Sequence, residues 1–171
     1  MNPLILDLKE KDDILYFTIA NINVSYANAI RRVILSDIPT IVFETLPHEK
    51  NKSNFYINTS KLNNEILKQR LACIPVHISD LDTPIHDLLL EVDVKNNSEN
   101  IIYVTTNDFK IKNIKNNKYL NDETVKEIFP PDKITNHYID FCRLNPKLSD
   151  NIPGEYIKFN CEFSLSTAKN N

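Results

Sequence analysis

The chain has 171 residues, enough for one ordinary domain or two small ones, and 42% of them are hydrophobic, which suffices for a buried core. Its net charge of −3 lacks the basic excess with which proteins usually bind nucleic-acid backbones. Its single glycine, Gly154, excludes Walker and dinucleotide-binding loops, because those loops need several glycines to bring backbone N–H groups close to phosphate.

The amino-terminal segment predicts two antiparallel strands. Residues 4–6 and 14–19 are apolar, and the charged run 9–13 between them is typical of a turn. The first seven residues have no basic region and too short an apolar run for a signal peptide, and no segment reaches membrane-spanning length. We therefore expect an intracellular protein with no membrane partner.

Residues 23–40 predict a helix with a defined start and stop. Asn23 or Ser25 can cap its beginning, and Pro39 prevents its continuation. Because successive residues advance by about 100°, apolar side chains collect on one arc, which we expect to be buried. That arc contains Tyr26, Ala27, Ala29, Ile30, Val33 and Ile34.

The opposite arc of this helix carries an adjacent arginine pair. Such a face is often simply solvated. It is also suited to docking, because arginine is enriched at protein interfaces and can bind a carboxylate or phosphate with two nitrogens. Periodicity leaves both interpretations open for Asn28, Arg31, Arg32 and Leu35.

Residues 40–46 predict a third strand, residues 49–54 a loop and residues 55–57 a short extended segment. A second helix is expected over 62–71, with Ser60 as a plausible cap. Its predicted buried stripe consists of Leu62, Ile66, Leu67 and Leu71.

Beyond Pro75 the pattern changes to short strand-like segments separated by polar loops, which predicts a mostly β unit. A helical turn is expected over 122–128, before two prolines. The strand-like segments are 88–94, 101–106, 109–111, 138–144 and 156–165.

Candidate chemistry is sparse. Cys73 with His77 could form a thiol nucleophile and its base, although Cys73 stands in an apolar run where cysteine behaves as a small hydrophobe. A metal site of Cys73, His77 and His86 fits no familiar ligand spacing. The lysines at 110, 112, 115 and 118 are typical of a solvated loop rather than a nucleic-acid site. We therefore expect no metal and no cofactor, and we keep a cysteine- or metal-dependent hydrolase and a stand-alone β-rich binding module as alternatives.

Two blocks carry a family resemblance. Residues 26–40, Tyr-Ala-Asn-Ala-Ile-Arg-Arg-Val-Ile-Leu-Ser-Asp-Ile-Pro-Thr, resemble the signature of the alpha-type assembly subunits of multisubunit DNA-directed RNA polymerases. These are the bacterial alpha subunit, its archaeal counterpart and the third-largest subunit of eukaryotic RNA polymerase II. Residues 58–76 are similar to the family's second block, with Asn64, Gln69 and Ala72 where the family usually has Asp, His and Gly. The resemblance as a whole covers about residues 14–80, somewhat under half of the chain.

The resemblance implies an α+β fold with a discontinuous dimerisation half-domain, made of antiparallel strands plus two helices, and a mostly β insert domain. Residues 1–79 would be the first part of the dimerisation domain and residues 80–171 the insert. The family's carboxy-terminal return segment, with further strands and a long helix, would then be missing, so we expect either that this chain is a fragment of a longer subunit or that another chain supplies those elements.

The resemblance also implies a function. The chain would be a structural subunit without catalytic residues, which pairs with a smaller alpha-like subunit and docks the large catalytic subunits, chiefly the equivalent of bacterial beta. Direct sequence-specific binding to nucleic acid is not expected. The partner-binding residues implied are Asn28, Arg31, Arg32, Leu35 and Arg70. The dimerisation or core positions are Tyr26, Ile30, Val33, Ile34, Leu67 and Leu71.

Three widely spaced cysteines, Cys73, Cys142 and Cys161, indicate neither a disulfide framework nor a zinc knuckle and favour a reducing compartment. That compartment would be the nucleus or the cytoplasm. The abundance of Asn, Lys and Ile suggests an AT-rich genome, and if the source were a large DNA virus the protein would also be expected in the virion.

Overall fold

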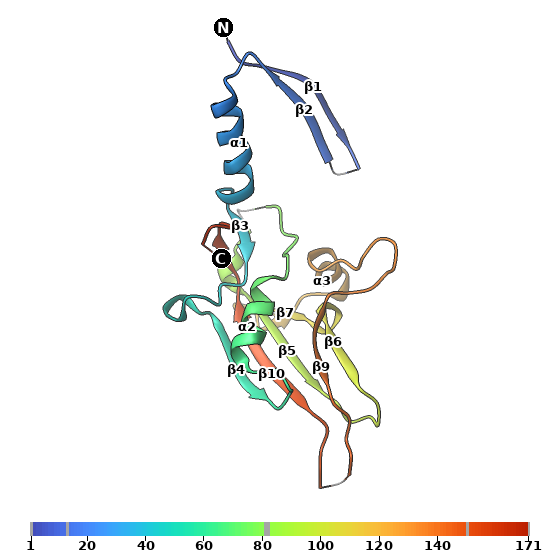
Figure 1. The fold of residues 1–171 in the computed structure, drawn as a ribbon. Helices are drawn as coiled ribbons and strands as arrows, with labels where there is room; N and C mark the ends of the chain where they lie inside the picture. Colours follow the sequence, from blue (N-terminus) through green and yellow to red (C-terminus); the bar gives the residue numbers. More distant parts are fainter. Residues whose placement is uncertain (1, 13, 81–82, 150, 171) are drawn as a thin grey trace. The chain divides into compact units, whose positions relative to one another are not determined.

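The structure, a computed structural model, describes residues 2–12, 14–80, 83–149 and 151–170. The chain forms two compact units, which we describe separately (Figure 1). Unit 1 contains the chain up to Pro39 together with Thr167–Lys169, and unit 2 contains Thr40–Ser166 with Asn170. Both helices and antiparallel sheets are present, which confirms the predicted α+β class.

Unit 1 begins with a β-hairpin, as predicted. Strand β1 (Leu4–Lys11) pairs antiparallel with β2 (Ile14–Ala20). Of the charged run expected in the turn, Lys9, Glu10 and Lys11 extend β1 instead, and Lys11 pairs with Ile14. Asp12 is in the turn, as predicted, and Asp13 lies outside the described residues. The register shifts between Leu6 and Lys9, where Asp7 has a φ of 54°, a left-handed conformation that Asp and Asn tolerate better than most residues.

Helix α1 (Val24–Ser36) follows the hairpin. Of the two predicted caps, Asn23 is the residue used: its side chain accepts a hydrogen bond from the Ser25 backbone N–H at 2.8 Å. At the other end the Asp37 backbone N–H donates to the Val33 carbonyl at 2.9 Å, and Pro39 then prevents another turn.

Unit 2 is built on a five-stranded antiparallel sheet in the order β4-β10-β5-β7-β8. Strand β10, almost the last in sequence, lies between β4 and β5, so the sheet is completed only by long-range pairing. The strands are β4 (Ser53–Asn58), β5 (Leu88–Lys95), β7 (Lys110–Asn113), β8 (Lys118–Tyr119) and β10 (Tyr156–Glu162).

Two smaller antiparallel pairs complete the β structure of unit 2: β6 (Ile102–Thr105) with β9 (Asp140–Leu144), and β3 (Thr40–Val42) with β11 (Ser164–Ser166). Its helices are α2 (Asn64–Ala72), which contacts β4 and β9, and α3 (Asp122–Ile128), the predicted helical turn. The three 3₁₀ turns in the described residues are His48–Lys50, Ile85–Asp87 and Thr106–Asp108.

The buried apolar residues among the described positions all lie between Ile41 and Phe163, within unit 2. Phenylalanines dominate this core: the Phe43 and Phe163 ring centroids are 4.9 Å apart, and those of Phe141 and Phe159 are 5.2 Å apart. Unit 1 contributes no buried side chain in the described residues, so unit 2 carries the hydrophobic core of the chain.

Gly154 lies where unit 2 brings two loop segments together. A Cβ at this position would overlap the backbone carbonyl of Asn96. Asn96 is itself fully buried and donates through its side-chain amide to the carbonyls of Asn100 and Leu144, at 2.8 and 2.9 Å. The only glycine of the chain thus permits a close approach of backbone to backbone.

Several boundaries differ from the sequence predictions. The compact units divide between Pro39 and Thr40, because β3, β4 and α2 are built into unit 2 through β11, β10 and β9. The predicted third strand ends at Val42, and the predicted strand 156–165 is two strands, β10 and β11. Which segments correspond to the family's dimerisation and insert domains remains a prediction.

Candidate functional site

One face of α1 forms an apolar hollow within unit 1. The hollow has a volume of about 460 Å³. Tyr26 is 68% exposed and Val33 is 50% exposed, so the predicted apolar arc is not covered by the rest of unit 1. The expectation that the arc is buried is therefore not met within the unit. The lining residues are Pro3, Ile22, Tyr26, Ala29, Ile30, Val33 and Ile34.

The hairpin of unit 1 is equally open. All eight residues of β1 are exposed, and in β2 the side chains of Leu15 and Tyr16 are more than half exposed. A two-stranded hairpin and one helix, neither with a buried core, are marginal as an independent structure in water. Contiguous apolar surface of this kind usually marks an interaction site.

The opposite face of α1 holds the predicted docking residues. The Arg31 guanidinium donates two hydrogen bonds to the side-chain oxygen of Asn28, from Nε at 3.1 Å and from an Nη at 2.9 Å. These bonds hold Arg31 along the helix surface. Arg32 and Leu35 are exposed beside it, so the four predicted residues share one accessible face.

The second family block has a structural role in unit 2. Thr59 joins this block to β10: its backbone N–H donates to the Tyr156 carbonyl at 3.0 Å, and its hydroxyl accepts from the Tyr156 N–H at 2.8 Å. Asn63, rather than the predicted Ser60, caps α2 by accepting from the Ile66 N–H at 2.9 Å. Ser60 instead donates its hydroxyl to the side chain of Asn58 at 2.7 Å.

The predicted buried stripe of α2 is only partly correct. Leu67 and Leu71 are fully buried in the core of unit 2, whereas Ile66 is 43% exposed and Leu62 lies half-buried before the helix begins. The residues predicted for dimerisation or for the core therefore fall into two groups: those on α1 are exposed, and those on α2 are buried in the core of unit 2.

Arg70 projects from α2 toward β9. Its guanidinium donates to the backbone carbonyl of Asp140 at 2.8 Å, a bond that connects the helix to the strand. Arg70 remains exposed and lines a second hollow with Arg143 and Lys61, two residues that sequence reasoning did not select. No local pattern indicates them, since Arg143 comes close to Arg70 only through the fold.

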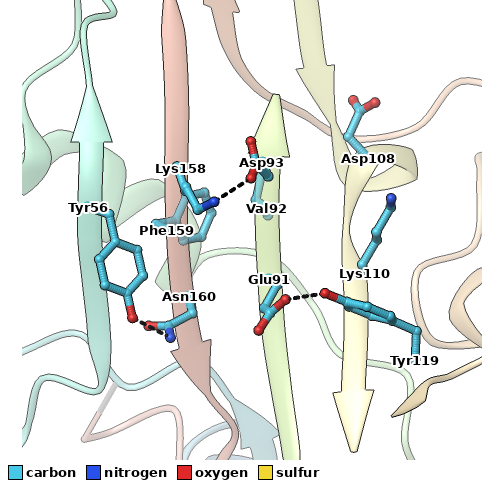
Figure 2. A pocket seen from close by; sticks show the side chains of 10 residues that line it. All are labelled: Tyr56, Glu91, Val92, Asp93, Asp108, Lys110, Tyr119, Lys158, Phe159 and Asn160. Atoms are coloured by element: carbon cyan, nitrogen blue, oxygen red, sulfur yellow. Dashed lines mark hydrogen bonds and ion pairs between the residues drawn. The ribbon is translucent and has the colours of Figure 1, made fainter. Parts of the chain in front are cut away.

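The open face of the main sheet carries a network of paired polar side chains (Figure 2). Lys158 forms an ion pair with Asp93 at 2.7 Å, and the Tyr119 hydroxyl donates to Glu91 at 2.6 Å. The hydrogen bond from Lys158 lowers the pKa of Asp93. A carboxyl group kept ionised in this way is suited to structural pairing and not to donating a proton.

The structure gives no support for Cys73 and His77 as a thiol nucleophile and its base. Cys73 is exposed at the carboxyl end of α2, and no hydrogen bond connects its sulfur to a histidine in the part of the chain described. Over the same residues, no group of three or more His, Cys, Asp or Glu side chains is placed to hold a metal. None of the described helices has both the length and the apolar run needed to span a bilayer.

Comparison with known proteins identifies the family. The family model described as the RNA polymerase Rpb3/Rpb11 dimerisation domain matches residues 16–137, which is more than half of the chain. The chain belongs to this family. The match confirms the resemblance to alpha-type RNA polymerase subunits, and it spans helix α1 as well as the α2 block.

Curated relatives agree with this assignment. The chain is 39% identical over 69 residues to DNA-directed RNA polymerase subunit Rpo3 of Pyrococcus furiosus, a match that covers 40% of this chain and 24% of the relative. It is 34% identical over 68 residues to DNA-directed RNA polymerase II subunit RPB3 of Schizosaccharomyces pombe, over 40% of this chain and 20% of that protein. The matched segment thus spans about a quarter or less of these relatives.

Proposed function

We propose that this protein is a non-catalytic assembly subunit of a multisubunit DNA-directed RNA polymerase. In this proposal, unit 1 pairs with a smaller alpha-like subunit, and the arginine face of α1 docks a large subunit, chiefly the equivalent of bacterial beta. The observation that carries the proposal is the uncovered apolar surface of α1, in a chain that belongs to a dimerisation-domain family.

The physical argument rests on burial. Fully burying an exposed apolar side chain contributes about 1.5–3 kcal/mol, and Ile30 and Val33, which are 39% and 50% exposed, would each contribute roughly half of that on association. Several such side chains line one hollow whose lining is almost entirely apolar, so a partner with a complementary apolar helix face gains stability there without leaving polar groups unpaired.

The arginine face supplies the second contact. Arg31 and Arg32 form no ion pair with the described residues, so their charges are available to a carboxylate-bearing surface. A planar guanidinium can donate two parallel hydrogen bonds to one carboxylate, and the fixed geometry of these bonds positions the partner. The apolar face and the arginine face lie on opposite sides of one helix, so the two partners need not compete.

The connections of unit 2 support the proposal, because they are those expected of an inserted domain. Its first strand, β3, pairs with its last strand, β11, so the chain enters and leaves unit 2 at adjacent positions. Such an arrangement is what a domain inserted into a second domain requires.

The test is to purify the tagged full chain from its source and to identify the associated proteins by mass spectrometry. We expect an alpha-like subunit and the two large RNA polymerase subunits in stoichiometric amounts. A chain that elutes alone as a stable monomer would contradict the proposal.

A further inference from the structure

The hollow beside Arg70 lies between α2 and the β6–β9 pair of unit 2 and has a volume of about 360 Å³. Its surface is mainly apolar, with charged side chains around it. The apolar contributors are Leu62, Tyr103 and Cys142, and the cations are Lys61, Arg70 and Arg143.

The cations around this hollow have no ion-pair partner among the described residues. The ion pairs among the described residues are formed by lysines elsewhere, and none involves Lys61, Arg70 or Arg143. The hollow is lined by three cations and by one carboxylate, that of Asp140. The site therefore carries a net positive charge in a chain whose overall charge is −3.

The fold fixes the positions of these groups. Arg70 is held by its hydrogen bond to the Asp140 carbonyl, and Arg143 is the cross-strand partner of Tyr103 in the β6–β9 pair. Burial raises the pKa of the Cys142 thiol to about 12, so this residue contributes a neutral, apolar surface. An apolar centre with cations at its edge matches an apolar side chain flanked by carboxylates.

We propose that this hollow binds an acidic segment of a partner protein, in which one apolar side chain fills the hollow and neighbouring carboxylates contact Arg143 and Lys61. A single-stranded nucleic acid is the weaker fit, because successive bases stack on several aromatic side chains and the lining of this hollow contains one, Tyr103. The proposal extends the proposed assembly role to unit 2, but the binding site does not involve α1.

The experiment uses the full chain and a fluorescein-labelled peptide with one Phe flanked on each side by two Glu residues, measured by fluorescence anisotropy at low salt. We expect saturable binding that weakens about fivefold to tenfold in Arg143→Glu and in Lys61→Glu. Lys118→Glu, which makes the same charge change at an exposed lysine of β8, should leave binding unchanged. Replacing the peptide's Phe with Gly should also weaken binding.

Three results would overturn the proposal: equal binding by all three charge variants, equal binding of the Phe and Gly peptides, or tighter binding of a thymidine oligonucleotide than of the peptide. Thermal unfolding of each variant establishes that it is folded, and Lys61→Glu gives an independent test if Arg143→Glu is not. Pairing with the alpha-like subunit is measured in parallel. Arg143→Glu should leave that pairing intact, so a failed peptide test and a failed assembly role are distinguishable.

Discussion

Thr40 and Ser166 are cross-strand partners in the β3–β11 pair, although almost all of unit 2 lies between them in the sequence. The chain therefore enters unit 2 and leaves it on neighbouring strands. Every buried apolar residue in the described part of the chain lies between these two positions. This closure makes unit 2 a self-contained structure.

Residues 40–166 should fold without the rest of the chain. Because the excised segment keeps the whole observed core, we expect its main thermal transition within about 5 °C of that of the full chain. Circular dichroism of both proteins measures this. A segment that remains unfolded would show that unit 2 depends on contacts outside it.

Ile30→Asp should weaken pairing with the alpha-like subunit by at least about tenfold, because it places a charge in the apolar hollow of α1. Val24→Asp is the matched control: it changes an exposed apolar residue of the same helix that does not line the hollow. Co-purification of each variant with the partner gives the comparison. Equal loss in both variants would mean that general helix destabilisation, rather than the hollow, explains the effect.

Arg31→Ala combined with Arg32→Ala should reduce recruitment of the large subunits and leave pairing with the small partner nearly intact. Arg31→Lys with Arg32→Lys retains the charge but not the planar fork, so we expect it to recover recruitment only partly. Quantitative mass spectrometry of the purified assemblies measures both contacts. If the alanine pair lost both partners equally, the arginines would be structural.

The local pattern of the sequence was sufficient for the hairpin, for α1 and for most strands of unit 2, whereas the choice of Asn23 over Ser25 as the cap of α1 came from the structure. The order of the main sheet could not be predicted in the same way, because β10 reaches its place between β4 and β5 only by long-range pairing. The division into compact units at Pro39 has the same origin, since β4 belongs to unit 2 through its pairing with the distant strand β10.

The candidate site shows the same limit. Helical periodicity predicted that the apolar face of α1 is buried, but that face is open within unit 1, because periodicity does not show whether a neighbouring element covers it. The cations around Arg70 come from segments far apart in the sequence, so only the fold brings Lys61 and Arg143 into one hollow.

The three cysteines should react very differently with iodoacetamide at pH 8. Cys73 is exposed, whereas burial raises the pKa values of Cys142 and Cys161 from their ordinary 9.0 to about 12 and keeps both thiols protonated. We expect one alkylated cysteine in the native protein, at Cys73, and three in guanidinium chloride. Rapid native labelling of Cys142 or Cys161 would contradict the burial.

The same shifts give a pH dependence of stability. Above pH 9 the two thiols ionise in the unfolded chain but stay protonated in the folded one, so the folded state binds more protons. The contribution of Cys142 and Cys161 to the free energy of unfolding is therefore complete below about pH 9 and is lost as the pH rises toward 12. Replacing both with serine should flatten this part of the profile.

Hydrogen–deuterium exchange of the full chain, measured alone and in the assembly purified from its source, tests the central claim most directly. If unit 1 is an assembly surface, the amides of α1 should exchange at least about tenfold more slowly in the assembly, while the core strands β5 and β10 change little. Equal exchange of α1 in the two states would contradict the account, because its apolar face would then remain uncovered where a partner is expected.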